Sequence, residues 1–343
     1  MPELSAPCNS DVSLRTKVDF LLRPESYPER PTRVDATETH MSWVFLTDSH
    51  AYKLKKPVRY PFLDFSTVEL RRIDCEEEVR LNRRLAPDVY LGVVALGLDP
   101  SGRLCVGGGR PVDWLVKMRR LPAERTLQHA IEANAVTQGD IVALARRLAV
   151  FYRSARKIDI SEPAYRRRFE DEIAASERAL LQPSHLMPQR LVGDIAAAQR
   201  RFLHRHGELL DRRVRDGRIV EAHGDLRPEH IYLGPAPVVT DCLEFNPSLR
   251  VLDPVDELAY LAMECERDGA PLVGSWLFAA YSKATDDVPP AALVAFYTVH
   301  CAFLRSRIAI SHLDEAEVRE PAKWPARTLS YLELAQGYIG SLA

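Results

Sequence analysis

The sequence predicts a two-lobed α+β fold, with a small lobe built on an antiparallel β-sheet and a larger, mainly helical lobe. Two observations lead to this prediction. Between residues 34 and 121, strand-like stretches are broken by a single amphipathic helix, whereas from residue 123 to 214 the apolar spacing is almost wholly helical. Two short apolar runs between residues 219 and 242 then interrupt the helices, and polar side chains stand at their ends.

The small lobe is expected to contain a hairpin, one helix and two further strands. These elements are predicted over residues 40–58, 67–86, 89–99 and 104–121, respectively. The helix ends at Pro87, which cannot continue it. The run Gly107–Gly109 is predicted to form a hairpin turn and not a phosphate-binding loop, because it leads to another strand and not to a helix.

The domain boundaries follow from these patterns. We place an N-terminal helical extension at 1–33, the small lobe at 34–121 and the helical lobe at 122–343. Within the helical lobe, helices are expected over residues 124–134, 138–155, 164–181, 189–211, 253–266, 271–282, 290–310 and 324–340. Two-lobed chains usually bind ligands between their lobes, which we expect here.

Composition excludes several classes of protein. The formal net charge is −2, from 46 basic and 48 acidic residues, without the clustered basic surplus of a nucleic-acid-binding protein. The six cysteines form no CxxC pair, so a disulfide framework or structural zinc site is not expected. The N-terminal stretch lacks the apolar core of a signal peptide, and no apolar run approaches the ~18 residues that span a bilayer. We therefore expect a cytoplasmic protein without nucleic-acid or membrane partners.

A cluster of polar residues lies where two short predicted strands should end. Asp225 follows one apolar run, His230 precedes the next, and Asp241 ends the strand 238–242 that a tight hairpin joins to it. This pairing brings two carboxylates and an imidazole to one point. Phosphoryl transfer uses such a set: one carboxylate orients the acceptor hydroxyl, and other ligands hold a divalent ion on the phosphates.

Phosphoryl transfer also requires a second, basic element that binds the phosphates from the opposite side. Lys53 and Lys55 lie two apart on a predicted strand and therefore share one face. A carboxylate from the following helix would orient such a lysine, and Glu76, Glu77 and Glu78 are the candidates.

Together these stretches resemble the aminoglycoside phosphotransferase family, which has a protein-kinase-like fold. The loop "HGDLRPEH" resembles its catalytic loop, "VVTDCLEF" its metal-binding segment, "AYKLKK" its lysine strand and "EEEVRLNRRLAPDVYLGVV" the helix with the lysine's partner. The likeness is closer to a bacterial subgroup of uncharacterised phosphotransferase-like proteins, some followed by a P-loop domain. No GxxxxGK[ST] motif occurs here, so a P-loop ATPase would be a separate partner.

The resemblance implies roles for individual residues. Asp225 matches the catalytic aspartate in the loop 223–230, and Asp241 the metal-binding one. Lys53 is the better match to the phosphate-gripping lysine, with Lys55 as the alternative, and Glu78 best matches its partner. The remaining matches are Lys117, Met118 and Arg119, whose backbone would contact an adenine ring, His223 as a structural histidine, and Asp256 or Glu257 as a support of the loop.

The resemblance also implies ATP, or GTP, with Mg²⁺ as cofactor. His230 stands where the family usually has asparagine, which would weaken Mg²⁺ binding, shift the preference towards Mn²⁺ or abolish metal binding. The favoured function is an ATP-dependent phosphotransferase for a hydroxyl group of a small molecule. A nucleotide-binding module without turnover is the alternative, and a metal-dependent hydrolase using the His/Asp cluster is a third reading.

The acceptor is expected to be small, because eleven residues separate Asp241 from Asp253, too few for a peptide-docking segment. Five acidic residues could attract a cationic acceptor or could form a solvated helix face, namely Asp253, Asp256, Glu257, Glu264 and Glu266.

Overall fold

The structure is a computed structural model that describes residues 12–60, 63–315, 318 and 320–342. It divides into two compact units. Unit 1 comprises Met1–Pro122 and Thr240–Asn246, and unit 2 comprises Ala123–Val239 and Pro247–Ala343. The segment 240–246 thus packs with the N-terminal unit although it is distant from it in sequence. Residues 1–11 of the expected N-terminal extension lie outside the described residues.

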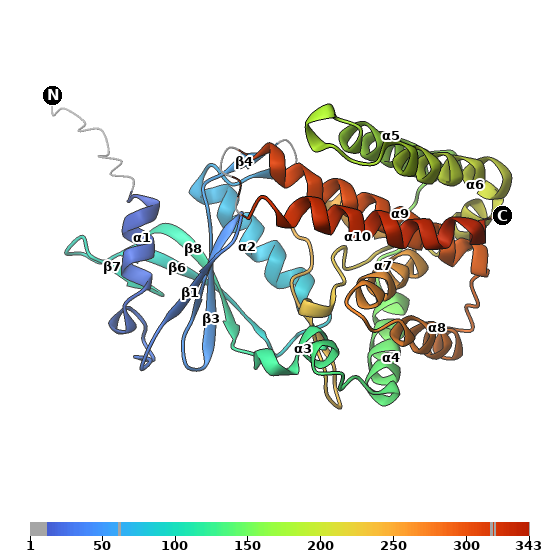
Figure 1. Cartoon of the computed structure of the whole chain (residues 1–343). Coiled ribbons are helices and arrows are strands. Elements are labelled where there is room, and N and C mark those ends of the chain that lie inside the picture. Colours follow the sequence, from blue (N-terminus) through green and yellow to red (C-terminus); the bar gives the residue numbers. More distant parts are fainter. Residues whose placement is uncertain (1–11, 61–62, 316–317, 319, 343) are drawn as a thin grey trace, which may run out of the picture. The chain divides into compact units, whose positions relative to one another are not determined.

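Unit 1 is built on an antiparallel sheet. Its helices and strands are α1 (Leu14–Leu21), η1 (Pro24–Ser26), β1 (Asp35–Glu38), β2 (Ser42–Leu46), β3 (His50–Lys55), β4 (Arg59–Tyr60), β5 (Leu63–Asp64), α2 (Val68–Asn82), β6 (Tyr90–Leu98), β7 (Leu104–Val106) and β8 (Arg110–Arg119). The sheet has the strand order β1-β2-β3-β8-β6-β7 (Figure 1). The polar edge strand β1 was not expected from the sequence, because an exposed edge need not carry an apolar alternation.

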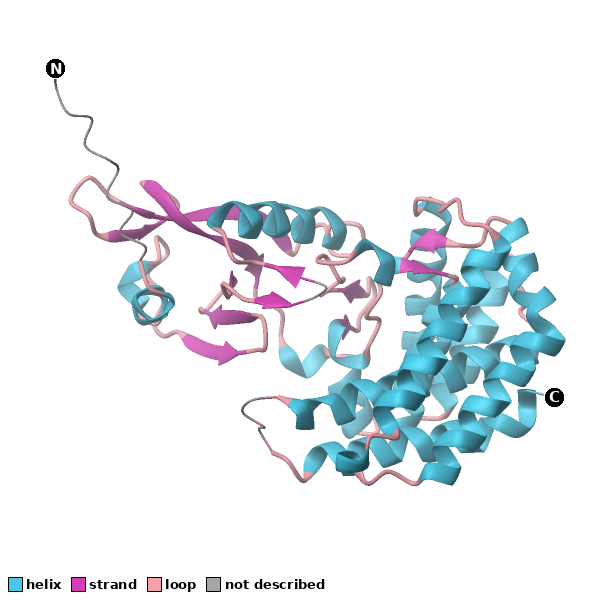
Figure 2. Cartoon of the chain, turned by 90° about the horizontal axis from the view of Figure 1, so that it is seen from above, coloured by secondary structure: helices cyan, strands magenta, loops and turns pink. Residues whose placement is uncertain are grey.

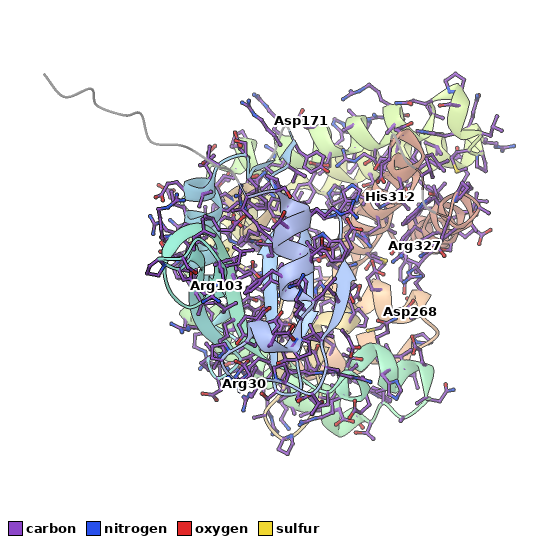
Figure 3. All side chains as sticks on the ribbon, turned by 90° about the vertical axis from the view of Figure 1, so that its left-hand side faces the viewer. Arg30, Arg103, Asp171, Asp268, His312 and Arg327 are labelled. Carbon is purple, nitrogen blue, oxygen red and sulfur yellow. The ribbon has the colours of Figure 1, made fainter. Side chains whose placement is uncertain are left out.

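The pleat of β3 gives its two faces different partners. Tyr52 and Leu54 join the apolar cluster that α1 covers with Val18 and Leu21, and Figure 3 shows α1 lying over the strands. The intervening lysines of β3 contact Glu78 of α2. Alternation along one strand therefore separates an apolar face from a charged face.

The glycines at 107–109 do not form a hairpin turn. They connect β7 to β8, and both strands pair with β6. The loop therefore crosses β6, where a Cβ on Gly97 would meet the carbonyl oxygen of Gly108 at 2.1 Å. The run serves this close backbone crossing.

Unit 2 is mainly helical, as expected. Its elements are η2 (Ala123–Arg125), α3 (Leu127–Glu132), α4 (Gln138–Ser154), α5 (Glu162–Leu180), η3 (Pro183–His185), α6 (Gln189–Arg215), β9 (Val220–Glu221), η4 (Pro228–His230), β10 (Ile231–Tyr232), β11 (Val238–Val239), η5 (Pro247–Arg250), β12 (Val251–Leu252), α7 (Pro254–Arg267), α8 (Leu272–Thr285), α9 (Ala291–Ser311), η6 (His312–Asp314), α10 (Lys323–Tyr338) and η7 (Ile339–Leu342). The α+β prediction is confirmed: the six-stranded sheet belongs to unit 1, whereas unit 2 has mainly helices and two short strand pairs, and Figure 2 distinguishes the strands from the helices by colour.

Local sequence explains where several helices begin. The side chains of Ser13, Thr67, Ser161 and Asp253 accept hydrogen bonds from backbone N–H groups of the first turns of α1, α2, α5 and α7. Thr137 forms a reciprocal capping box at the start of α4. These caps satisfy donors that a helix leaves unpaired at its first turn.

Helix α9 forms the core of unit 2 and packs against α5, α6, α7 and α10. The stretch Ala291–Asp314 is long and apolar enough to cross a membrane by length and composition, but 72% of its most apolar window is buried inside the protein. The expectation that no apolar run approaches spanning length is therefore wrong for this helix. A helix that is apolar on all sides is also what a protein core requires.

Two short strand pairs frame the polar loop of unit 2. β10 and β11 form the expected antiparallel hairpin, with Ile231 opposite Val239. β9 pairs with β12, which the sequence did not predict, since Val251–Leu252 is too short to show a pattern. Both strand pairs hold the polar loop at its ends.

A buried carboxylate joins α1 and α2 to the sheet, and we expect its loss to be severe. Asp113 of β8 accepts from Arg71 of α2 at 2.8 and 2.9 Å and from Lys17 of α1 at 2.8 Å. Asp113→Ala leaves two buried cations uncompensated, so the free energy of unfolding should fall by about 3–5 kcal/mol in urea titrations. The exposed Asp35→Ala is the control, and an equal change in both variants would contradict the assignment.

Candidate functional site

The first candidate cluster lies on the charged face of β3. The ammonium of Lys53 is 3.0 Å from Oε1 of Glu78 and 3.0 Å from Oδ1 of Asp241. Burial alone would lower the pKa of Lys53, but Asp241 and Glu78 outweigh it and raise that pKa well above its ordinary value. Lys53 therefore stays charged, and its side chain retains 15% exposure.

Lys55 occupies a different environment although it shares the same strand face. Its side chain is 1% exposed, and its ammonium contacts Asp74 at 2.5 Å, Glu78 at 2.6 Å and Glu244. We call Lys55 and these three carboxylates the Lys55 cluster. Because the ammonium is enclosed, a ligand can reach Lys53 but not Lys55. Asp74 and Glu244 were not singled out from the sequence.

Among the three adjacent glutamates of α2, the structure brings only Glu78 to both lysines. Its side chain is fully buried, whereas Glu76 and Glu77 are paired with Arg72 and Arg80 on the outer face. Burial raises the pKa of Glu78, but Lys53 and Lys55 together hold it below its ordinary value. The carboxylate thus stays ionised and bridges the two ammonium groups.

The carboxylates of the Lys55 cluster outnumber its cation. Burial raises the pKa of Glu244 to about 7 and also raises that of Asp74. The three carboxylates lie within 4.8 Å of one another, which is a spacing that could hold a metal ion. Since the ammonium of Lys55 already contacts all three, we assign this set to Lys55 and not to a metal.

Asp241 lies two residues beyond the end of β11, which is shorter than the expected strand 238–242. Its φ of +60° is in the left-handed region, which is unusual for a residue other than glycine. Its N–H donates to the hydroxyl of Tyr90 at 3.1 Å, and the N–H of Cys242 donates to Oδ1 of Asn82 at 2.9 Å. These contacts hold the carboxylate, which is 49% exposed, next to Lys53.

Lys117, Met118 and Arg119 lie at the end of β8, which has β3 on one side and β6 on the other. Lys117 is in register with Tyr52 and Gly92. The N–H of Arg119 donates to the carbonyl of Val89 at 2.8 Å. The sheet therefore uses the backbone groups that were expected to contact adenine, because a central strand is paired along both edges.

The second candidate cluster is the polar loop of unit 2. Nε of Arg227 lies 3.0 Å from Oδ1 and 3.1 Å from Oδ2 of Asp225. The hydroxyl of Tyr260 donates to Oδ1 of the same carboxylate at 3.1 Å. Arg227 also pairs with Glu229 at 2.8 Å. Asp225 is thus fixed in orientation by groups from its own loop and from α7. Arg227 and Tyr260 were not predicted as site residues.

His230 contacts its own loop through both ring nitrogens. Nδ1 lies 2.9 Å from the carbonyl oxygen of Asp225, and Nε2 lies 3.3 Å from Nη2 of Arg227. The tautomer protonated at Nδ1 satisfies both contacts, as it donates to the carbonyl and accepts from the guanidinium. A metal ion at Nε2 would have to displace Arg227, so this geometry favours a role of His230 in holding the loop.

Glu257 supports the polar loop from α7. One of its oxygens accepts from the N–H groups of His223 at 2.9 Å and Gly224 at 2.6 Å, and Tyr152 donates to the other at 2.8 Å. The N–H of Asp225 donates to Nδ1 of the buried His223 at 3.3 Å. Of the two acidic residues expected to compete for this position, the structure therefore brings Glu257 to the loop.

The acidic residues that could attract a cationic acceptor form ion pairs and hydrogen bonds within the protein. They are Asp253, Asp256, Glu257, Glu264 and Glu266. Asp253 forms a bidentate ion pair with Arg213, with N–O distances of 2.6 and 2.8 Å. Glu264 accepts from Arg305 at 2.9 Å and from Tyr331 at 2.8 Å. Asp256 and Glu266 likewise contact Cys301 and Tyr338.

No protein-family model matches the chain. An uncharacterised protein of Mycobacterium tuberculosis is 35% identical over 288 residues, which cover 80% of this chain and 54% of the relative. The chain therefore spans about half of the length of this curated relative.

Solved structures share the fold over nearly the whole chain. A choline/ethanolamine kinase family protein from Mesorhizobium loti matches 95% of this chain and 98% of its own, with a TM-score of 0.56 and 12% identity. A choline kinase from Cryptosporidium parvum matches 95% of this chain and 96% of its own, with a TM-score of 0.58 and 10% identity. The kinase-like fold that the sequence resemblance implied is confirmed.

The buried carboxylate of Asp256 should make stability depend on pH. Burial raises its pKa to about 7, so folding favours its protonated form. Stability from this group is complete at low pH and is lost as pH rises through about 7. Relative to Asp256→Asn, the wild type should lose about 2 kcal/mol of unfolding free energy between about pH 5.5 and about pH 7.5.

Urea titrations of both proteins across this pH range measure the difference. The comparison cancels titrating groups that the two proteins share. A constant difference between wild type and Asp256→Asn would show that Asp256 is ionised throughout and would contradict the expectation.

Proposed function

We propose that the chain is an ATP-dependent phosphotransferase that acts on a hydroxyl group of a small molecule. The observation that carries the proposal is Lys53, whose ammonium lies 3.0 Å from both Glu78 and Asp241. A buried glutamate that orients a partly exposed lysine beside an exposed carboxylate provides a cation and an anion for a metal–nucleotide complex. The kinase-like fold supports this reading.

In this proposal Lys53 binds phosphate oxygens of the nucleotide, while Glu78 keeps its side chain in place. Asp241 would hold the divalent ion, since an exposed carboxylate is an oxygen ligand of the kind that Mg²⁺ prefers. The ion supplies neutralisation of charge on the transferred phosphoryl group. We place the adenine contact beyond Arg119, because the sheet uses the preceding backbone groups.

Asp225 is proposed to orient the acceptor hydroxyl and to receive its proton. Arg227 and Tyr260 hold the carboxylate, and Glu257 fixes the loop backbone beneath it. This pre-organisation reduces the conformational freedom that the acceptor complex would otherwise have to restrict. General-base catalysis of this kind contributes about 10²–10⁴ in rate.

The acceptor is proposed to be small and not to need a cationic group. The five acidic residues at the start of α7 and along it are occupied by arginine, tyrosine, cysteine or backbone donors. Choline and ethanolamine are informative probes because two proteins of the same fold carry those names. Uncharged polyols and hydroxy acids complete the panel.

A nucleotide-binding module without turnover is the second candidate. It is favoured by the contacts on Asp225, since Arg227 and Tyr260 already occupy both oxygens of the carboxylate that an acceptor hydroxyl would have to approach. The cluster of Lys53, Glu78 and Asp241 would bind nucleotide in both cases. Turnover in the presence of an acceptor separates the two functions.

Replacement of the proposed base should abolish turnover and spare nucleotide binding. Asp225→Asn should lower acceptor-dependent ADP release by at least about 10²-fold, because the amide cannot receive the hydroxyl proton. The exposed Asp216→Asn is the matched control. Unaltered turnover in Asp225→Asn would refute the catalytic assignment. ADP affinity, measured by calorimetry, should be the same in all three proteins.

Replacement of the partly exposed Lys53 should weaken nucleotide binding. Lys53→Met removes a charged hydrogen bond to phosphate, so ATP affinity should fall roughly 10- to 100-fold. The control is Lys56→Met, since Lys56 pairs with Glu38 at 2.6 Å and not with the cluster. Equal ATP affinity of Lys53→Met and wild type would contradict the phosphate-binding role.

A further inference from the structure

The two lysines of β3 differ in what a ligand can do to their contacts. Lys53 is partly exposed and its partner Asp241 is 49% exposed, so a bound nucleotide can take both groups for its phosphates and metal ion. Lys55 is enclosed by Asp74, Glu78 and Glu244 and makes contacts that a ligand cannot reach. We therefore expect the contacts of Lys55 to remain in place when a bound nucleotide replaces the contact between Lys53 and Asp241.

One of the permanent contacts reaches the segment that carries Asp241. Glu244 follows Asp241 by three residues and is 8% exposed, and it accepts from the ammonium of Lys55. The other two partners of Lys55 come from α2. Lys55 thus joins β3 and α2 to the segment Thr240–Asn246, which packs with unit 1 although strand β11 before it belongs to unit 2.

Further hydrogen bonds complete the attachment of this segment. Tyr90 accepts from the N–H of Asp241, Asn82 accepts from the N–H of Cys242, and Arg84 donates to the sulfur of Cys242 at 3.2 Å. The backbone at Asp241 has a φ of +60°, which a non-glycine residue adopts only when its surroundings hold it there. The charged contact at Glu244 lies directly after this strained position.

We propose that Lys55 and Glu244 are positioning residues that hold Asp241 in its place while its carboxylate passes from Lys53 to a bound metal ion. The inference rests on the proposed function, because it takes Asp241 as the metal ligand. Two lysines on one strand face then have separate tasks: Lys53 meets the nucleotide, and Lys55 fixes the segment that bears the ion's ligand. This assignment explains why a second, inaccessible lysine is surrounded by carboxylates.

The test compares two carboxylates of the same lysine. Glu244→Ala removes the link to the segment 240–246, while Lys55 keeps Asp74 and Glu78. Asp74→Ala removes a partner of equal charge from α2 and leaves the link intact. Each variant keeps two carboxylates on the buried ammonium, so both are expected to fold. Glu244→Gln retains an acceptor for Lys55 and serves as the conservative replacement.

Two quantities are measured on the full chain. Hydrogen–deuterium exchange without ligand reports on the amides of Asp241 and Cys242, and calorimetry gives the affinity for ADP with and without Mg²⁺ or Mn²⁺. In Glu244→Ala we expect exchange at least about tenfold faster and loss of most of the affinity that the metal adds. Metal-free ADP affinity should be unchanged, and Glu244→Gln should restore much of both effects.

A merely structural role of the Lys55 cluster would affect both alanine variants alike. Equal changes in Glu244→Ala and Asp74→Ala, or unchanged exchange in Glu244→Ala, would overturn the inference. Faster exchange together with an unchanged metal contribution would also overturn it, since Asp241 would then not need the attachment. Absence of ADP binding in the wild type would refute the proposed function, and the exchange measurement would still decide the attachment.

Discussion

The interaction on which the described structure of unit 1 depends is the sharing of Glu78 between the partly exposed Lys53 and the buried Lys55. Side chains alternate along β3, so Lys53 and Lys55 must leave the same face together. Two ammonium groups with little access to water require carboxylates, and the fully buried Glu78 stays ionised because both lysines contact it. This requirement fixes which face of α2 turns to the sheet and brings the segment 240–246 to the strand.

The sequence predicted the parts of this arrangement that follow from local periodicity and from motif order. Lys53, Glu78 and Asp241 stand in recognisable stretches, and the structure brings them together. The choice among three glutamates could also have been made from helix phase, because Cys75, Val79 and Asn82 are buried on the face that includes Glu78. Asp74 lies one turn before Glu78 on the same face of α2, so helix phase could have indicated it too. Glu244 gave no such signal, since its role comes from a contact with a strand distant in sequence.

The polar loop shows a different limit of prediction. Asp256 and Glu257 are adjacent in the first turn of α7, so they point about 100° apart around the helix. Glu257 meets the loop amides, and Asp256 faces Cys301 of α9. Sequence alone could not decide between them, because both acidic side chains suit a helix N-terminus and the choice depends on how α7 is rotated in its packing. Tyr260 lies one turn after Glu257 and therefore reaches the same loop.

The two proposed catalytic carboxylates are carried by different units, and this division makes their roles experimentally separable. Asp241 shares unit 1 with Lys53, Lys55 and Glu244, so metal–nucleotide binding reports on that cluster. Asp225 shares unit 2 with Arg227 and Tyr260, so its loss should appear in turnover and not in ADP affinity. A chain that binds metal and ADP normally but transfers nothing would therefore place the deficit on the Asp225 loop, where Arg227 and Tyr260 occupy both carboxylate oxygens of Asp225.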